Sequence, residues 1–514
     1  MPSRAGAAAV CLAAGCALSF AFPAWDIAPL AWLAIAPLLV AVRGRPAAFA
    51  FGCGVLFGMG FFGLLAAWVA MIGVLAWLAL SLCQAVFIGV FAASWAVASR
   101  RLQGLMGALA AASLWVAVEY LRSRFPLGGF PWGQIAQSQH DYSSLLSLAA
   151  FGGGWAVSFV VVFVNAVAIE LFRGLRTRRT TGVIPVAAGV ALLVTATVAA
   201  GAALAPPPAA SGPAVRVAIV QGSTPLSFDG TYYEKQVAIL RSHLRLTRDL
   251  LKRGVSPDIV VWPESSIGID LDDNPWVVRS IGSLARRLRA TIIAGGNLEA
   301  GPDHYKVMAF EFSPDGRLVG RYRKTHLVPF GEYLPFRGLL DWLPGTSQIP
   351  RDAVAGHEPV LFDTPHGKVA PVISYEGDFG PLVRNRIAAG GRLLVVATNT
   401  STWGRSSASL QHLAFSQVRA AENGVWVVHA SIAGTSAFVA PDGGVVSSTP
   451  LWERATMAHT VHFSRGTTFY ARTGDWLAYL CLALGAICVI APAAMTEPVA
   501  EQDGEEERVE PELT

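Results

Sequence analysis

Long apolar stretches and short apolar runs occupy different parts of this chain. A helix needs about 20 apolar residues to cross a hydrocarbon core about 30 Å thick. The sequence has candidate stretches of this kind near residues 7–22, 27–42, 47–66, 71–98, 104–121, 151–172, 183–204 and 475–493. The first two are short and also fit a tight helical hairpin. We therefore predict a membrane α-helical bundle of about eight spans, with seven before a polar middle region and one after it.

The polar middle region has the pattern of a layered α/β domain. Short apolar runs rich in β-branched residues are typical of buried strands, and helical patterns lie between several of them. The predicted strands are 215–220, 258–262, 290–294, 369–373, 393–398 and 424–430, and the predicted helices are 232–253, 277–289 and 409–422. Strands that alternate with helices indicate a sheet covered by helices.

These patterns divide the chain into five parts. Residues 1–204 are predicted to be an N-terminal transmembrane region with seven spans, followed by a proline-rich linker over 205–213. The α/β domain covers 214–464, and the last transmembrane helix with its lead-in covers 465–494. Residues 495–514 form an acidic tail.

The positions of the arginines predict how the helices are oriented, because Lys and Arg are retained on the cytoplasmic side of a membrane. Arginines precede the first predicted span and follow the second, fourth and sixth spans, namely Arg4, Arg43, Arg45, Arg100, Arg101, Arg173, Arg176, Arg178 and Arg179. The N-terminus and the acidic tail are then cytoplasmic, and the α/β domain is extracytoplasmic. Arg122 and Arg124, after the fifth span, are exceptions to this alternation.

Composition supports this division and excludes several classes of protein. Of the 514 residues, 53% are hydrophobic and only 14% are charged, whereas soluble domains carry about 25% charged residues. This excludes an ordinary cytosolic enzyme and a disordered chain, and a net charge of +4 gives no argument for nucleic acid. All six cysteines lie in apolar runs, so we expect neither a disulfide framework nor a zinc site.

Three polar segments that adjoin predicted strands are candidates for a chemical site. They are Trp-Pro-Glu-Ser around Glu264, the basic segment 321–332 with Lys324 and His326, and the step around Ser374. Taken singly, each has an ordinary interpretation: a solvated carboxylate or helix cap, an exposed basic strand with a structural histidine, and a turn serine. Only their combination indicates a site.

The loop over residues 125–134 is rich in aromatic residues, proline and glycine. It fits two interpretations equally. In the first, its aromatic residues lie at the membrane interface, where such residues are enriched. In the second, the loop is a shaped lip that contacts lipid or the α/β domain.

In their order and spacing, the three segments resemble the Glu-Lys-Cys site of the nitrilase superfamily. With the predicted spans on either side, nearly the whole chain resembles the apolipoprotein N-acyltransferase family, with further matches at residues 129–133, 220–222 and 469–476. The resemblance implies a nitrilase-like αββα sandwich attached to the membrane helices.

The resemblance also assigns roles to residues of this chain. It implies that Glu264 is the general base and that Lys324 is the cation that stabilises the oxyanion. Glu332 is a second carboxylate that supports the site, and Tyr375 and Glu376 flank the nucleophile.

Position 374 departs from the family, because this chain has serine where the family has its catalytic cysteine. A hydroxyl depends wholly on its base, whereas a thiol is intrinsically nucleophilic. We therefore expect slow acylation, slow transfer, or both. Two explanations fit the sequence: a deliberate replacement of cysteine that traps the enzyme, or a natural lineage that uses serine or has lost activity.

The reaction implied by the resemblance is the last step of bacterial lipoprotein maturation. An acyl chain passes from a phospholipid to the N-terminal cysteine α-amine of diacylglyceryl apolipoprotein through an acyl-enzyme, in a ping-pong sequence. We expect a monomer in the bacterial inner membrane that uses no metal or other cofactor and binds no nucleic acid. The alternatives are a catalytically silent membrane protein that binds lipid or lipoprotein, and a membrane-tethered carbon–nitrogen hydrolase.

Overall fold

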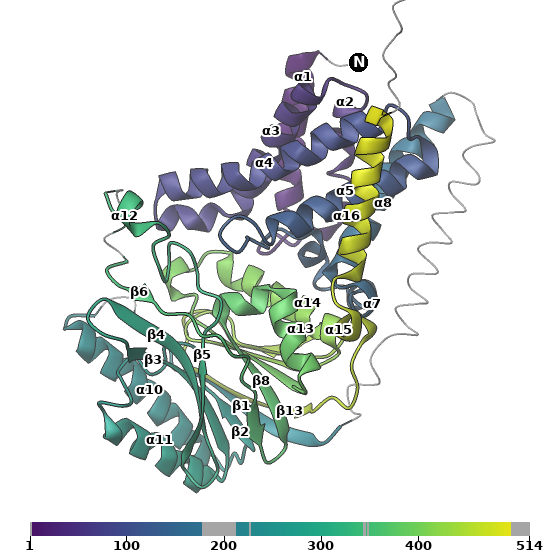
Figure 1. Cartoon of the computed structure of the whole chain (residues 1–514). Helices are drawn as coiled ribbons and strands as arrows, with labels where there is room; N and C mark the ends of the chain where they lie inside the picture. Colours follow the sequence, from purple (N-terminus) through teal and green to yellow (C-terminus); the bar gives the residue numbers. More distant parts are fainter. Residues whose placement is uncertain (1–2, 177–211, 226–227, 343–345, 347–348, 495–514) are drawn as a thin grey trace, which may run out of the picture.

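The computed structural model describes residues 3–176, 212–225, 228–342, 346 and 349–494. It has a helical part and an α/β part, which lie one above the other in Figure 1. The seventh predicted span at 183–204, most of the proline-rich linker and the acidic tail lie outside the described residues.

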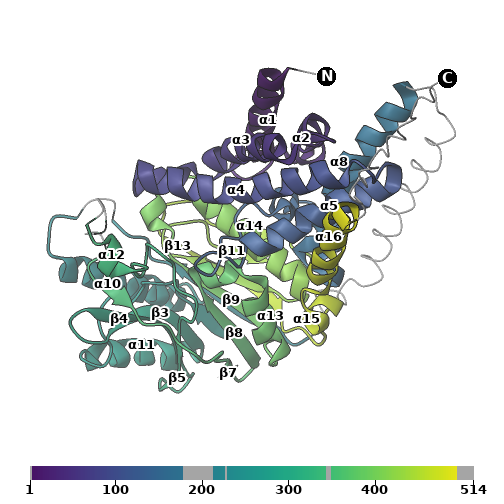
Figure 2. The ribbon, with the colours of Figure 1, turned by 45° about the horizontal axis from the view of Figure 1, so that its top comes forward.

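The helical part contains both ends of the described chain. Its main helices are α1 (Arg4–Ser19), α3 (Ala47–Leu65), α4 (Val74–Ala98), α5 (Gly104–Arg122), α8 (Gly154–Arg176) and α16 (Trp476–Ala494). Four of them, α3, α4, α5 and α8, are long and apolar enough to cross a membrane. Helix α16 packs beside α5, although the whole α/β part separates them in sequence (Figures 1 and 2). The count of eight spans stays a prediction.

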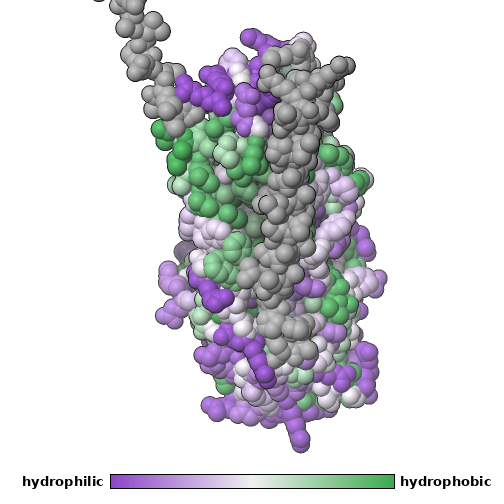
Figure 3. All heavy atoms as spheres, turned by 90° about the vertical axis from the view of Figure 1, so that its right-hand side faces the viewer, coloured by the Kyte–Doolittle hydropathy of each residue, from purple (hydrophilic) through white to green (hydrophobic). Residues whose placement is uncertain are grey.

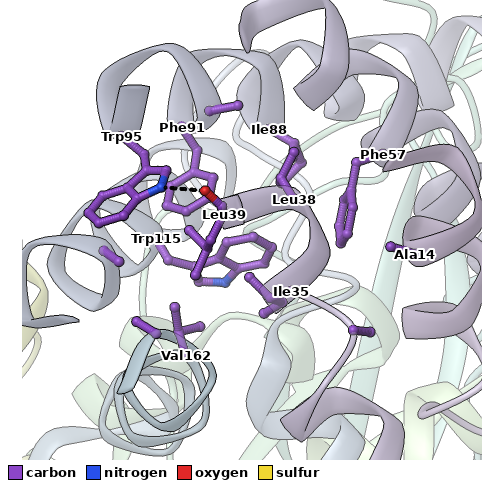
Figure 4. Close-up of a cluster of buried hydrophobic side chains, with 14 of the residues drawn as sticks. Ala14, Ile35, Leu38, Leu39, Phe57, Ile88, Phe91, Trp95, Trp115 and Val162 are labelled. Atoms are coloured by element: carbon purple, nitrogen blue, oxygen red, sulfur yellow. Dashed lines mark hydrogen bonds between the residues drawn. The ribbon is translucent and has the colours of Figure 1, made fainter. Parts of the chain in front are cut away.

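Large aromatic residues fill the interior of the helical part. Phe57 of α3, Phe91 and Trp95 of α4 and Trp115 of α5 are buried and gather in one cluster (Figure 4). The Trp95 indole N–H donates a hydrogen bond of 3.0 Å to the Leu39 carbonyl oxygen. In a membrane, close packing and hydrogen bonds of this kind hold helices together, because lipid is as apolar as the side chains.

The outer surface of the helical part is apolar. On the face seen in Figure 3, hydrophobic side chains gather over the helices, and hydrophilic side chains dominate the far end of the α/β part. Large apolar side chains such as Leu75 of α4 and Ile490 of α16 are mostly exposed. This distribution is the one expected of helices that face lipid.

The second predicted span is not one continuous helix. Residues 27–42 form a short 3-10 helix, η1 (Ala28–Trp32), and the helix α2 (Ala36–Val42), with a break between them. The fully buried Asn165 of α8 lies at this break. Its Oδ1 accepts hydrogen bonds from the backbone N–H groups of Ile35 and Ala36 at 3.2 and 3.1 Å. The asparagine is therefore the acceptor for the buried Ile35 N–H, and a second acceptor for the Ala36 N–H, which also donates to the Leu33 carbonyl oxygen at 3.2 Å.

Two β-sheets form the centre of the α/β part. The first has the order β13-β1-β2-β3-β4-β5, with β6 beside β4, and the second has the order β12-β11-β10-β9-β8-β7. The strands of the first sheet are β1 (Ala214–Gln221), β2 (Ile259–Val261), β3 (Thr291–Glu299), β4 (His304–Phe312), β5 (Leu318–Arg323), β6 (Asp352–Ala353) and β13 (Ala455–His462). Those of the second are β7 (Phe362–Thr364), β8 (Gly367–Ile373), β9 (Leu393–Thr398), β10 (Val427–Ser431), β11 (Ala437–Val439) and β12 (Val445–Ser448).

The sheets pack face to face, and helices cover their outer faces. Val261 and Ile293 of the first sheet share a buried core with Ile373 and Val395 of the second. On the outer faces, α10 (Tyr232–Lys252) and α11 (Pro275–Leu288) cover the first sheet, and α13 (Gly380–Ala388) and α14 (Ala408–Asn423) cover the second. The predicted αββα sandwich is confirmed. Each predicted strand and helix of this part is present, with ends shifted by a few residues.

Helix α14 joins the two parts of the molecule and lies between them in Figures 1 and 2. All of its residues except the half-buried Leu410 are buried, because one side faces the second sheet and the other faces the helical part. Val418 packs on the helical part. The Gln411 side-chain amide donates hydrogen bonds of 3.0 and 3.1 Å to the Pro23 and Leu65 carbonyl oxygens, and its oxygen accepts one of 3.0 Å from the Trp68 indole.

Replacing Asn165 tests the break in the second span. Asn165→Leu keeps the number and branching of the side-chain heavy atoms but removes the partner of the buried Ile35 N–H, which costs about 1–3 kcal/mol when unsatisfied. We expect a lower midpoint of thermal unfolding in detergent, measured by intrinsic fluorescence. The control is Asn385→Leu, at an exposed position of α13. Equal midpoints for the two variants would show that Asn165 does not stabilise the break.

Candidate active site

Glu264 lies just beyond the carboxyl end of β2. Trp262, which is fully buried, fixes this end of the strand by donating a hydrogen bond of 2.9 Å from its indole N–H to Thr247 Oγ1. Gly295 of β3 packs directly against the same segment. A residue with a side chain at position 295 would place its Cβ atom only 2.6 Å from the Glu264 Cα atom, which is too close. Glu264 is thus packed between strands, and only 7% of the residue is exposed.

Lys324 follows β5 directly and is 1% exposed. Its Nζ lies 2.6 Å from Glu332 Oε1 and 3.5 Å from Glu264 Oε1. The second Glu332 oxygen accepts a hydrogen bond of 2.8 Å from the Val328 backbone N–H, which fixes that carboxylate. The interpretation of this segment as an exposed basic strand is therefore wrong for Lys324, which is a buried cation between two carboxylates.

Burial and charge set the protonation of this cluster. Burial raises the pKa of Glu264 to about 7; Lys324 opposes the increase and Glu332 adds to it. Burial alone would lower the pKa of Lys324, but the negative charges of Glu332 and Glu264 outweigh it and hold this pKa above its ordinary value. Near neutral pH, Lys324 therefore stays positively charged while Glu264 is able to take up and return a proton.

Ser374 lies at the sharp turn where β8 ends and the 3-10 helix η5 (Ser374–Asp378) begins. Its φ angle of 50° is in the left-handed region, which costs a residue with a side chain about 1–3 kcal/mol and is concentrated at functional sites. Strand β9 runs parallel to β8, and Thr398 at its end donates a hydrogen bond of 3.1 Å from Oγ1 to Ser374 Oγ.

Glu376 ties the ends of two strands from different sheets together. One of its oxygens accepts hydrogen bonds of 2.7 Å from both the backbone N–H and the hydroxyl of Thr325, and one of 2.6 Å from the Tyr322 hydroxyl. Its other oxygen accepts a hydrogen bond of 2.8 Å from the Ile373 N–H. Burial acts to raise the pKa of Glu376, but Arg386 and these hydrogen bonds hold it below its ordinary value. A carboxylate thus links the residue after Lys324 to the residue before Ser374.

A polar dipeptide at the end of β9 connects Ser374 with Glu264. Thr398 contacts Ser374, and the backbone N–H of the next residue, Asn399, donates to the Glu264 carboxylate. The structure thus brings Glu264, Lys324 and Glu332 into direct contact and places Ser374 at the neighbouring strand end.

The loop over residues 125–134 reaches this region from the helical part. The Tyr375 hydroxyl donates a hydrogen bond of 2.7 Å to the Gly129 carbonyl oxygen, and the Trp132 indole donates one of 3.0 Å to Asp378 Oδ2. Arg122, buried at the end of α5, holds the loop by donating to the Trp132 carbonyl oxygen at 2.6 Å. The interpretation of this loop as a lip that contacts the α/β domain is confirmed.

Three residues of this region, Thr398, Asn399 and Arg386, were not among the predicted site residues. A signal for the first two was present: parallel strands end at the same edge of a sheet, so polar residues after the predicted strand 393–398 belong beside those after 369–373. For Arg386, a lone arginine in a helical pattern, the sequence offered no such signal.

Comparisons with known proteins agree with both parts of the structure. The family model described as "Apolipoprotein N-acyltransferase N-terminal domain" matches residues 14–167, and the one described as "Carbon-nitrogen hydrolase" matches residues 216–470. The second match places the α/β part in the nitrilase superfamily, as predicted.

Curated relatives match over almost the whole chain. A protein of Geobacter metallireducens named apolipoprotein N-acyltransferase is 33% identical over 505 residues, which are 95% of each chain. Proteins with the same name are 32% identical in Azotobacter vinelandii, over 90% of this chain and 91% of the relative, and 31% identical in Gloeobacter violaceus, over 93% and 92%.

Amidases are among the solved structures that are similar to about half of this chain. An amidase from Nesterenkonia sp. AN1, with the acetamide moiety of fluoroacetamide on its active-site cysteine, has a TM-score of 0.39 and 16% identity over 52% of this chain and 95% of the amidase. Another structure of an amidase from Nesterenkonia sp. has a TM-score of 0.38 and 17% identity over the same shares. The extent and identity of the curated matches show that this chain belongs to the apolipoprotein N-acyltransferase family.

Proposed function

We propose that this chain moves an acyl chain from a phospholipid to the α-amine of the N-terminal cysteine of diacylglyceryl apolipoprotein. The observation that carries the proposal is the buried contact of Lys324 with Glu264 and Glu332, beside a strained strand-end residue at 374. The names of the relatives support the same reaction.

In the first half-reaction, Glu264 takes the hydroxyl proton of Ser374 as Oγ attacks the ester carbonyl carbon of the phospholipid. Lys324 stabilises the negative charge that develops on the carbonyl oxygen. The tetrahedral intermediate collapses by breaking the bond to the glycerol oxygen. That oxygen takes the proton from Glu264, and lysophospholipid leaves an acyl-enzyme behind.

In the second half-reaction, the amine of the lipoprotein attacks the acyl-enzyme. Glu264 takes a proton from the attacking nitrogen, and the bond between the acyl carbon and Ser374 Oγ breaks. The proton returns to Oγ, which restores the enzyme and releases an N-acyl lipoprotein. Conversion of an ester into an amide lowers the free energy, so the transfer requires no external energy source.

We place this chemistry at the outer surface of the bacterial inner membrane. Both substrates are anchored in lipid, so the site must lie close to the bilayer. The contacts of Tyr375 and Asp378 with the loop over residues 125–134 support this placement, because that loop follows α5 of the helical part directly. The alternation of the arginines supports an extracytoplasmic α/β domain.

A catalytically silent protein that binds phospholipid or lipoprotein is the second candidate. The observation that favours it is Ser374, because a hydroxyl is a poorer nucleophile than the thiol of the family and forms a less reactive oxyester. The two candidates differ in whether the chain releases lysophospholipid.

Restoring a thiol should increase the activity. We expect Ser374→Cys to transfer label from phosphatidylethanolamine to a diacylglyceryl lipopeptide in detergent micelles roughly tenfold faster or more than the parent chain. In that background, Glu264→Gln should slow transfer by about 100-fold or more, because a general base typically contributes at least this factor. If Ser374→Cys forms neither labelled enzyme nor labelled lipopeptide, residue 374 is not the nucleophile.

The pH dependence of acylation should report Glu264. A base that must be deprotonated is lost as the pH falls through its pKa of about 7, so the rate should fall about tenfold per pH unit below that value. Above it the rate should level off, since Lys324 keeps its charge. The measurement is lysophospholipid release by the parent serine chain from pH 5 to pH 9. A flat profile, or the same profile in Glu264→Gln, would rule out this role.

A further inference from the structure

A polar cavity of about 160 Å³ lies between α10 and the segments that follow β2 and β9, and Ser265, the residue after Glu264, is part of its lining. Ten residues line it, and eight of them carry a polar side chain. Residues from α10, from the segment after β2, from β3 and from the segment after β9 meet there. The proposed reaction mechanism uses none of their side chains, and a lining of this kind suits a polar group rather than an acyl chain.

The cavity offers hydrogen-bond donors that have no protein partner. Among the described residues, the side chains of Lys235, Gln236 and Asn297 make no hydrogen bond or ion pair. Asn399 uses its Oδ1 to accept hydrogen bonds of 3.0 and 2.6 Å from the backbone N–H and hydroxyl of Ser401, which leaves its NH₂ group available. None of these donor atoms is sealed from solvent, so a ligand that enters the cavity can reach them.

The charge that the lining residues give the cavity is positive only. Lys235 is the only ionisable side chain among its lining residues apart from the phenol of Tyr232, and no carboxylate lines it. An ammonium surrounded by amide and hydroxyl donors has the chemistry of a site for an oxyanion such as phosphate.

The position of the cavity relates it to the reacting ester. Ser265, which lines the cavity, follows Glu264 in sequence, and the Asn399 backbone N–H donates to the Glu264 carboxylate. The residue before Asn399 contacts the Ser374 hydroxyl. A phospholipid whose ester carbonyl lies at Ser374 has its phosphate only a few bonds away, within reach of this space.

We propose that this cavity binds the phosphodiester of the acyl donor, with Lys235 as its counter-charge and the amides of Gln236, Asn297 and Asn399 as additional donors. The proposal rests on the proposed acyl-transfer function and adds an explanation of how the protein selects its acyl donor. A glycerophospholipid is held by its phosphate while its ester is attacked, whereas an ester without phosphate lacks this attachment.

The kinetic test compares two acyl donors with the same acyl chain in the Ser374→Cys background: phosphatidylethanolamine and a p-nitrophenyl ester. We expect Lys235→Met to lower the ratio of the two acylation rates by about tenfold to a hundredfold, the value of one charge-assisted hydrogen bond. The control is Lys252→Met, because Lys252 lies on the same helix, is exposed and pairs with Asp249. An unchanged ratio in Lys235→Met overturns the proposal, as does a loss confined to transfer onto the lipopeptide.

A binding test separates this proposal from the proposed function. Calorimetry in detergent should show that sn-glycero-3-phosphoethanolamine binds more tightly than inorganic phosphate, and that Lys235→Met weakens its binding at least tenfold. If the parent and Ser374→Cys form no acyl-enzyme but this binding difference is found, the acyl-transfer function fails while the phosphate site stands. If acylation occurs and Lys235→Met binds the phosphodiester as well as the parent does, the site fails while the function stands.

Discussion

The burial of the Lys324 ammonium is the constraint on which the rest of the site depends. Removing a charge from water costs several kcal/mol unless partners compensate, and Glu332 and Glu264 supply that compensation at 2.6 and 3.5 Å. Glu332 must be close enough to pair, which fixes the loop that follows β5, and the Val328 N–H holds its carboxylate in place. The arrangement also explains why Glu264 titrates near neutrality: burial raises its pKa and one lysine, shared with Glu332, does not fully reverse the increase.

A second carboxylate extends this arrangement across the sandwich and toward the membrane helices. Glu376 accepts hydrogen bonds from backbone N–H groups on both sides, at Thr325 near the lysine and at Ile373 before Ser374. The neighbouring Tyr375 and Asp378 bind the loop over residues 125–134. The turn that carries Ser374 is therefore held by the first sheet and by the helical part at once, which suits a reaction whose substrates both come from a bilayer.

The sequence predicted the parts of the fold that depend on continuous apolar patterns. Parallel strands such as β9 are buried on both faces and read as unbroken apolar runs. The antiparallel strand β13 is half-buried or exposed at every position except Val461 and reads Ala-Thr-Met-Ala-His-Thr-Val-His, so an apolar pattern does not reveal it. Asn165 also could not be interpreted from sequence, because its role depends on a break in a helix that lies about 130 residues away in the chain.

The two arginines that interrupted the predicted charge alternation have structural partners. Arg122 is buried against the loop it holds, and Arg124 pairs with Asp475 at the start of α16.

The sequence supplied Glu264, Lys324 and Ser374 as candidates through their resemblance to a family. The polar residues that connect them, Thr398 and Asn399, became evident only when β8 and β9 were found side by side.

The central claim is that residue 374 receives the acyl group. Its most direct test is tandem mass spectrometry of the parent chain and of Ser374→Cys, quenched after incubation with phosphatidylethanolamine and without an acceptor. We expect one added acyl mass on the peptide that contains residue 374, as an oxyester that resists hydroxylamine in the parent and as a thioester that hydroxylamine releases readily in the variant. An acyl group found on any other residue, such as Ser265 or Thr398, would contradict it.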